Sequence, residues 1–199
     1  MTIYITDRIP TREQCEELMA EHSMLPNIVE HSFQVMRVSL AITDNLKDGV
    51  SVNRDLVIAA ALLHDITKTR SLKTKERHAA SGGVLLRDLG YERVAGIVEQ
   101  HVTLLNLNLE GRLEEMEIVY YADKRVMHDK IVTIDDRVDD LIRRYANGEE
   151  ILRSRILKNK EQALAVERKI AGFMKIDIQD ALKMLPVQPG QKVLAQCVE

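Results

Sequence analysis

The sequence predicts an all-α protein, and three observations support this fold class. Apolar residues recur with helical spacing along most of the chain, few stretches alternate as strands do, and glycine (9) and proline (4) are scarce. With 199 residues, of which 45% are hydrophobic and 30% charged, the chain is long enough to bury a core of ordinary domain size.

The first three helices have recognisable starts. Thr11 opens a capping box, so a helix is expected from there to about His22. A second helix is expected over 27–46, where a run of apolar residues ends before an Asp-Gly pair. Asn53 can cap a third helix over 54–66. The middle of this helix is apolar on all sides, which places it in the centre of a domain.

More helices are expected after a basic loop, separated by glycines and by one polar stretch. Their expected ranges are 76–89, 91–105, 112–126, 135–146, 149–174 and 177–185, followed by an irregular tail. We therefore expect an N-terminal helix in 1–25, a helical core in 26–148 and a C-terminal helical appendage with a tail in 149–199. The apolar stripe of this appendage could pack on the core or on a second copy of the chain, which would make a homodimer.

The composition argues against several classes of protein. The net charge of −3, from 28 basic and 31 acidic residues, shows no excess of positive charge of the kind that binds duplex nucleic acid. The two cysteines, Cys15 and Cys197, are too far apart and too few for a disulfide framework or a cysteine-rich zinc site. The longest uncharged apolar run, 56–63, is too short to cross a membrane, and the N-terminus does not resemble a signal peptide. A cytoplasmic protein without a membrane partner is expected.

Several histidines and aspartates stand beside segments that should be buried. They are His31, His64, Asp65, His78, His101 and Asp123. A buried imidazole or carboxylate is costly unless it is paired or bound to a metal. Imidazole and carboxylate ligands without a thiolate suit Mn, Fe, Zn, Ni, Co or Mg. Taken singly, each residue has a plain alternative as a hydrogen-bonded core or surface side chain.

The order of these residues along the chain resembles that of the HD-domain superfamily of metal-dependent phosphohydrolases. The phrase LLHDITK is similar to the His-Asp motif of that superfamily, HSFQVMRVSLAI is similar to its first-histidine helix, and the resemblance covers roughly 26–145. The resemblance implies an HD-type helical bundle in which one metal ion is bound by four residues. These are His31, His64, Asp65 and Asp123.

Two further matches resemble the branch of the superfamily that holds two metal ions. There, the equivalent of Asp65 bridges to a second ion, which the equivalents of His78 and His101 hold. The implied cofactors are two divalent transition-metal ions (Fe, Mn, Ni, Co or Zn), with Mg as another option. His78 could instead serve the substrate.

A cluster of basic residues follows the His-Asp pair. Lys68 lies three residues after Asp65 and completes a pattern, HDxxK, that resembles family members in which the lysine contacts the substrate phosphate. The rest of the basic loop adds Arg70, Lys73, Lys75 and Arg77. Such a loop could raise the local concentration of an anionic substrate, or it could be an ordinary solvated loop.

The function that the resemblance implies is hydrolysis of a phosphomonoester, phosphodiester or phosphoanhydride. The expected partner is a small, nucleotide-like phosphorylated molecule, attacked by metal-activated water, with catalytic roles for Asp65 and Lys68. Two alternatives remain open. One is a mixed-valent di-iron oxygenase, which would use the same four histidines and two aspartates. The other is a non-catalytic, nucleotide-sensing HD module, whose usual sign would be a missing ligand.

Overall fold

The computed structural model describes residues 8–186, and over that range it confirms an all-α fold. The first seven helices are α1 (Arg12–Glu21), α2 (Pro26–Thr43), α3 (Arg54–Leu63), α4 (Lys68–Thr74), α5 (His78–Asp88), α6 (Glu92–Val98) and α7 (Glu115–Lys124). A hairpin of two short strands follows, β1 (Val126–Met127) and β2 (Lys130–Ile131). The last helices are α8 (Ile134–Tyr145), α9 (Glu150–Phe173) and α10 (Ile178–Lys183).

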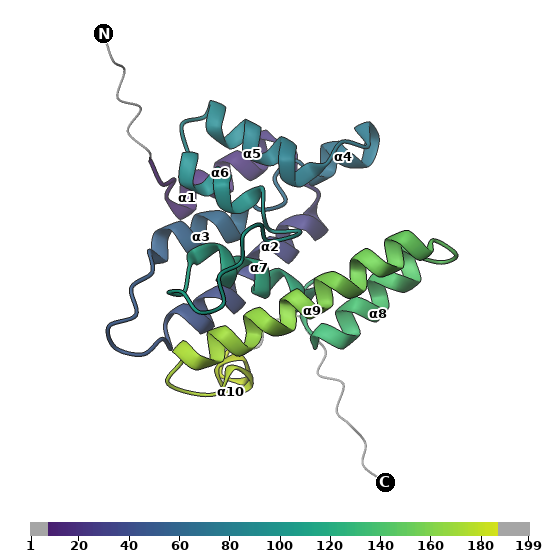
Figure 1. The fold of residues 1–199 in the computed structure, drawn as a ribbon. Coiled ribbons are helices and arrows are strands. Elements are labelled where there is room, and N and C mark those ends of the chain that lie inside the picture. Colours follow the sequence, from purple (N-terminus) through teal and green to yellow (C-terminus); the bar gives the residue numbers. More distant parts are fainter. Residues whose placement is uncertain (1–7, 187–199) are drawn as a thin grey trace.

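Helix α3 forms the centre of the bundle, as its uniformly apolar sequence predicts. It contacts α1, α2, α6 and α7, which surround it in Figure 1. Its side chains from Ala59 to Leu63 are all fully buried. The side chain of Asn53 caps its first turn by accepting a hydrogen bond from the backbone N–H of Leu56 (3.0 Å). The burial of this helix places its C-terminal end, with His64 and Asp65, inside the molecule.

The segment expected as a basic loop contains a helix, α4, and the expectation of a loop was wrong for 68–74. Lysine, arginine and leucine are good helix formers, and a run of like charges does not prevent a short helix whose side chains all reach water. The helix ends where Lys75 adopts a left-handed conformation, with φ of 62°.

Helix α6 ends earlier than the sequence predicts, at Val98 instead of about residue 105. The segment from there to α7 is irregular and contains Asn106 in the left-handed region. Asparagine tolerates this conformation. Leu104 of the segment is buried, but Leu105 and Leu109 are 65% and 45% exposed, so their helical spacing is misleading. The polar stretch expected only as a break, after α7, holds the β1–β2 hairpin.

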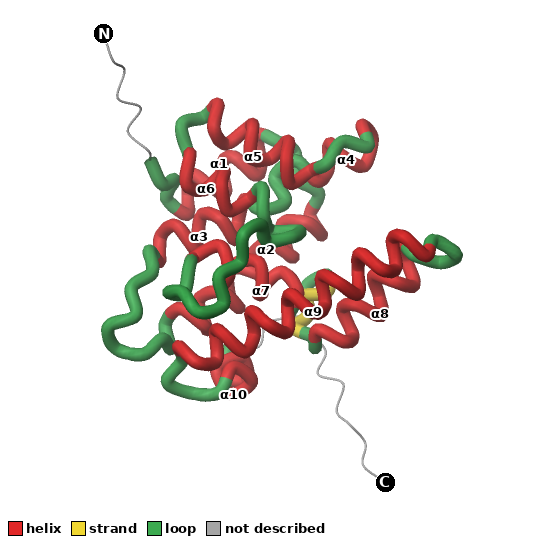
Figure 2. Tube along the Cα trace, in the orientation of Figure 1, coloured by secondary structure: helices red, strands yellow, loops and turns green. Residues whose placement is uncertain are grey.

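The C-terminal helices form a hairpin that is only partly attached to the core. Helices α8 and α9 pack side by side, and their connected ends project away from the body in Figures 1 and 2. The second half of α9 returns to the core, where Ala163, Val166 and Ile170 are buried. Near its start, Ile151 is 72% exposed. None of the helices in the described range is long and apolar enough to cross a membrane. The boundary of the appendage and its contact with a second copy remain predictions.

Candidate metal centre

All six predicted ligands meet at one place, although five separate helices bring them there. His31 lies in the second turn of α2, and Asp123 in the last turn of α7. His78 is the first residue of α5. The remaining three follow helix ends, His64 and Asp65 after α3 and His101 after α6. All except His78 are buried, and His78 is partly buried.

The first group of ligand atoms contains both oxygen and nitrogen donors. The Oδ1 atom of Asp123 lies 3.1 Å from Nε2 of His31 and 3.7 Å from Nε2 of His64. The same His64 nitrogen lies 3.7 Å from Oδ2 of Asp65. Nitrogen and oxygen atoms at these separations can share one metal ion, and His31, His64 and Asp65 form one of two groups that could do so.

The second group lies on the other side of the Asp65 carboxylate. Its Oδ1 atom is 3.2 Å from Nε2 of His78 and 3.5 Å from Nε2 of His101. The two histidine Nε2 atoms lie 3.2 Å from each other. Asp65 thus presents Oδ2 to the first group and Oδ1 to the second, and it belongs to both groups that could hold a metal ion.

Backbone carbonyls fix the orientation of three of the four histidine rings. The Nδ1 atoms donate to carbonyl oxygens: His31 to His128 (2.9 Å), His64 to Ala61 (2.8 Å) and His101 to Val98 (2.7 Å). A ring that carries its proton on Nδ1 leaves a lone pair on Nε2, directed at the cluster. Metal-binding histidines commonly have such an outer partner.

The donor set fits divalent metal ions. Nε2 of His64 and Oδ1 of Asp65 are buried and have no hydrogen-bond partner among the described residues. Buried polar atoms without a partner are rare in native proteins and call for an explanation. A metal ion in each group would satisfy both atoms.

The protonation states of the cluster also suit metal binding. Burial lowers the pKa of His64 to about 4, and burial also lowers the pKa of His78. Both rings are therefore neutral at pH 7, as ligands must be. Burial by itself would raise the pKa of Asp65, but the neighbouring histidine rings and Lys68 hold it well below its usual value. For Asp123, Lys124 has the corresponding effect on a pKa that burial would otherwise raise.

Lys124 supports the cluster from outside. Its Nζ atom donates to Oδ2 of Asp123 (2.7 Å) and to the carbonyl of His101 (2.8 Å), and it lies 4.5 Å from the centre of the Tyr120 ring. Because Lys124 occupies Oδ2, the other oxygen of Asp123 faces the histidines.

Of the five residues predicted to bind the substrate, one contacts the ligand cluster. The Nζ atom of Lys68 lies 3.7 Å from Oδ1 of Asp65 and 3.3 Å from Nε2 of His78, and its side chain is 34% exposed. Arg70 forms an ion pair with Glu76 (2.5 Å). The other three are exposed: Lys73, Lys75 and Arg77.

His128 has a role that the sequence did not reveal. The side chain is exposed, but the backbone carbonyl of His128 accepts a hydrogen bond from the ring of His31. The backbone of His128 adopts a left-handed conformation, with φ of 58°, at the turn between β1 and β2. A backbone acceptor leaves no trace in residue type, so no sequence signal could have identified it.

Comparison with known families assigns the chain to a family. The sequence model of the HD domain matches residues 28–128, which include all six ligand residues. The chain therefore belongs to the HD-domain family, whose members bind divalent metals, and its His/Asp cluster is compatible with a metal site.

Three curated relatives share parts of their sequence with this chain. A dihydroneopterin 2',3'-cyclic phosphate phosphodiesterase of Methanocaldococcus jannaschii is 42% identical over 57 residues, or 28% of this chain and 23% of that protein. A tRNA (cytidine(56)-2'-O)-methyltransferase of Picrophilus torridus is 28% identical over 144 residues, or 66% of this chain and 40% of that protein. The enzyme of the same name from Thermoplasma volcanium is 31% identical over 146 residues, or 66% of this chain and 41% of that protein. The chain thus spans less than half the length of these relatives. No solved structure is significantly similar to it.

Proposed function

We propose that this chain is a phosphohydrolase that uses two divalent metal ions to cleave a phosphate ester of a small, nucleotide-like molecule. The observation that carries this proposal is the division of the Asp65 carboxylate between two groups of ligands. A structural role for buried histidines would not require two convergent sets of Nε2 atoms around one carboxylate.

Each ion has its own set of ligands in this proposal. The first would be held by His31, His64, Asp65 and Asp123, and the second by Asp65, His78 and His101. Imidazole-rich sites favour Fe, Mn, Co, Ni or Zn over Mg. When bound, two such ions supply a water of lowered pKa and positive charge for the phosphoryl oxygens.

Lys68 is the residue that we expect to contact the phosphate. Its ammonium group is beside the second group of ligands and remains partly exposed, so it can donate to a phosphoryl oxygen that approaches from solvent. A fixed positive charge there stabilises the charge that develops during the reaction. Lys73, Lys75 and Arg77, exposed on α4 and the turn after it, would attract an anionic substrate.

The relatives suggest which substrates to test first. One of them is, by its name, a phosphodiesterase for a 2',3'-cyclic phosphate, so cyclic phosphates of small molecules head the panel. We do not extend methyl transfer to this chain, because about three fifths of each methyltransferase lies outside the match. We propose that the shared part is a helical module of the HD type.

The test is metal-dependent hydrolysis in the absence of oxygen, with Mn²⁺, Co²⁺, Ni²⁺, Zn²⁺ or Fe²⁺ supplied separately. The panel contains cyclic phosphates, nucleotides, dinucleotides and simple phosphoesters. We expect turnover that Asp65→Ala abolishes and that Asp88→Ala, which removes an exposed carboxylate, leaves unchanged.

Other results would favour the alternatives. Oxidation that needs both iron and oxygen, without anaerobic hydrolysis, would identify a di-iron oxygenase. Tight nucleotide binding without turnover under either condition would identify a sensing module.

A further inference from the structure

The segment after His101 lacks regular secondary structure but is firmly held. It runs from the end of α6 to the start of α7. Because it is not helical, its backbone N–H and C=O groups need hydrogen-bond partners elsewhere. Several of those partners come from α9, which is far away in sequence and lies beyond the part of the chain that the family model matches.

Two amide side chains of α9 bind the residues directly after His101. Gln162 accepts a hydrogen bond from the N–H of Leu104 (3.1 Å) and donates one to the carbonyl of the same residue (3.0 Å). Asn159 accepts from the hydroxyl of Thr103 (3.2 Å) and donates to the carbonyl of Val102 (3.4 Å). The three residues that follow His101 are therefore tied to α9.

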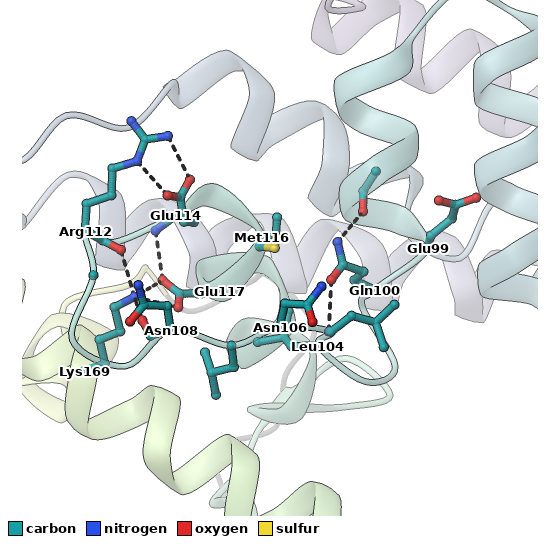
Figure 3. A pocket seen from close by; sticks show the side chains of 14 residues that line it. Glu99, Gln100, Leu104, Asn106, Asn108, Arg112, Glu114, Met116, Glu117 and Lys169 are labelled. Atoms are coloured by element: carbon teal, nitrogen blue, oxygen red, sulfur yellow. Dashed lines mark hydrogen bonds and ion pairs between the residues drawn. The ribbon is translucent and has the colours of Figure 1, made fainter.

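A buried lysine of α9 holds the far end of the same segment. The Nζ atom of Lys169 donates to the carbonyls of Asn108 and Arg112, each at 2.8 Å. It also pairs with the Glu117 carboxylate of α7 at 2.7 and 2.8 Å (Figure 3). Asn159, Gln162 and Lys169 are three and seven residues apart, so they share one side of the helix.

One side of the segment lines an open pocket. The pocket has a volume of about 600 Å³, and Figure 3 shows Gln100, Asn106, Met116 and Lys169 around it. Leu104 and Leu113 of the segment are buried in the core, and the hydrogen bonds to α9 fix the backbone between them. On its upstream side, His101 is held through its ring by Val98 and through its carbonyl by Lys124.

We infer that α9 positions His101, with Gln162 as the principal positioning residue, and so determines the affinity of the second ligand group for its ion. This inference rests on the proposed function, since it concerns one of the two ions assigned there. The second half of α9 then contributes to metal binding, although this helix supplies no ligand.

The test compares Gln162→Ala with Glu161→Ala in the full chain. The two residues are neighbours on α9, and the side chain of Glu161 is exposed. Metal-free protein is titrated with Mn²⁺, and free and bound ions are counted by electron paramagnetic resonance. Loss of an outer partner of a metal ligand commonly weakens metal binding by about 10- to 100-fold. Gln162 acts on His101 through Leu104, so we expect Gln162→Ala to weaken binding of the second ion by no more than the lower end of that range, about ten-fold, and to leave the first ion unchanged. Glu161→Ala should keep the wild-type values.

Further variants separate positioning from general damage to the fold. Gln162→Glu keeps the acceptor for the N–H of Leu104 but loses the donor, so its affinity for the second ion should be intermediate. If Gln162→Ala does not fold, Asn159→Ala removes the contacts of α9 with Val102 and Thr103 and should also weaken binding of the second ion only.

The outcomes distinguish this inference from the function on which it rests. Two ions bound equally well by wild type and Gln162→Ala would overturn the role of α9 and leave the two-ion site intact. Equal weakening of both ions would also overturn it, since the effect would not be specific to His101. A wild-type chain that binds only one ion at saturation would overturn the two-ion function and this inference together.

Discussion

At the scale of single residues, Lys124 connects the two groups of ligands. Its ammonium group bonds the Asp123 carboxylate, which belongs to the first group, and the carbonyl of His101, which belongs to the second. The Tyr120 ring covers it, and only about an eighth of its side chain is exposed (12%). Because the Lys124 ammonium group is already bonded to Asp123 and His101, we expect it to orient these two residues and not to bind the substrate.

Replacing Lys124 should therefore affect metal binding before it affects substrate binding. In Lys124→Met, Asp123 loses the partner of Oδ2 and can rotate, so we expect about ten-fold weaker binding of the first ion and a smaller loss at the second. Mn²⁺ titration of the metal-free protein measures both, with the exposed Lys158→Met as control. Unchanged metal affinity with a raised KM would instead assign Lys124 to the substrate phosphate.

The buried neutral histidines make the metal-free protein sensitive to acid. Burial lowers the pKa of His64 to about 4, whereas an unfolded chain has a histidine pKa near 6.5. Between these values the unfolded state binds more protons, so the free energy of unfolding falls as the pH is lowered. Urea unfolding of metal-free protein between about pH 7 and pH 5 should show this decline, and His64→Gln should reduce it. A free energy of unfolding that rises over this interval would contradict the neutral state of His64.

The sequence singles out the candidate ligands, which the fold brings together, but it does not reveal the groups that support them. Histidines and aspartates beside apolar helices stand out, because burying them without partners is costly. The carbonyls of Ala61, Val98 and His128, which orient the rings, belong to residues whose type is irrelevant to that role. The hydrogen bonds from Gln162 join positions far apart in sequence that no local pattern relates.

At the scale of elements, helix starts were easier to predict than helix ends. Thr11 and Asn53 cap their helices with side chains, as their residue types indicate. The end of α6 at Val98 depends on a turn that no glycine or proline marks in the sequence. Helix α4 was not predicted, because its charged residues indicated a solvent-exposed loop. A short helix exposed to solvent accommodates the same residues.

Helix α3 should be the element least tolerant of substitution. Leu62 is fully buried in the central cluster, so Leu62→Ala would leave a cavity and lower the free energy of unfolding by about 2–5 kcal/mol. Leu72→Ala on α4 is the matched control, since Leu72 is 53% exposed and should cost less than about 0.5 kcal/mol. Urea denaturation of both variants provides the measurement. Equal losses would argue against α3 as the centre of the bundle.

At the scale of the whole molecule, the candidate metal centre joins parts of the chain that are far apart. Its ligands come from α2, α5 and α7 and from the segments after α3 and α6, and His31 and Asp123 are 92 positions apart. The unfolded chain cannot hold these residues together, so metal ions should bind the folded state much more strongly. The ions would then act as cross-links between the helices that surround α3.

Removing the metal should therefore lower the melting temperature. A ligand at about 100 times its Kd stabilises the folded state by about 2.7 kcal/mol per site, which for a chain of this size corresponds to a shift of about 5–10 °C. Chelation followed by thermal denaturation, with and without added Mn²⁺, measures the shift. Asp65→Ala should show almost none of it, because both groups lose their shared carboxylate. A metal-dependent shift of full size in Asp65→Ala would place the ions elsewhere.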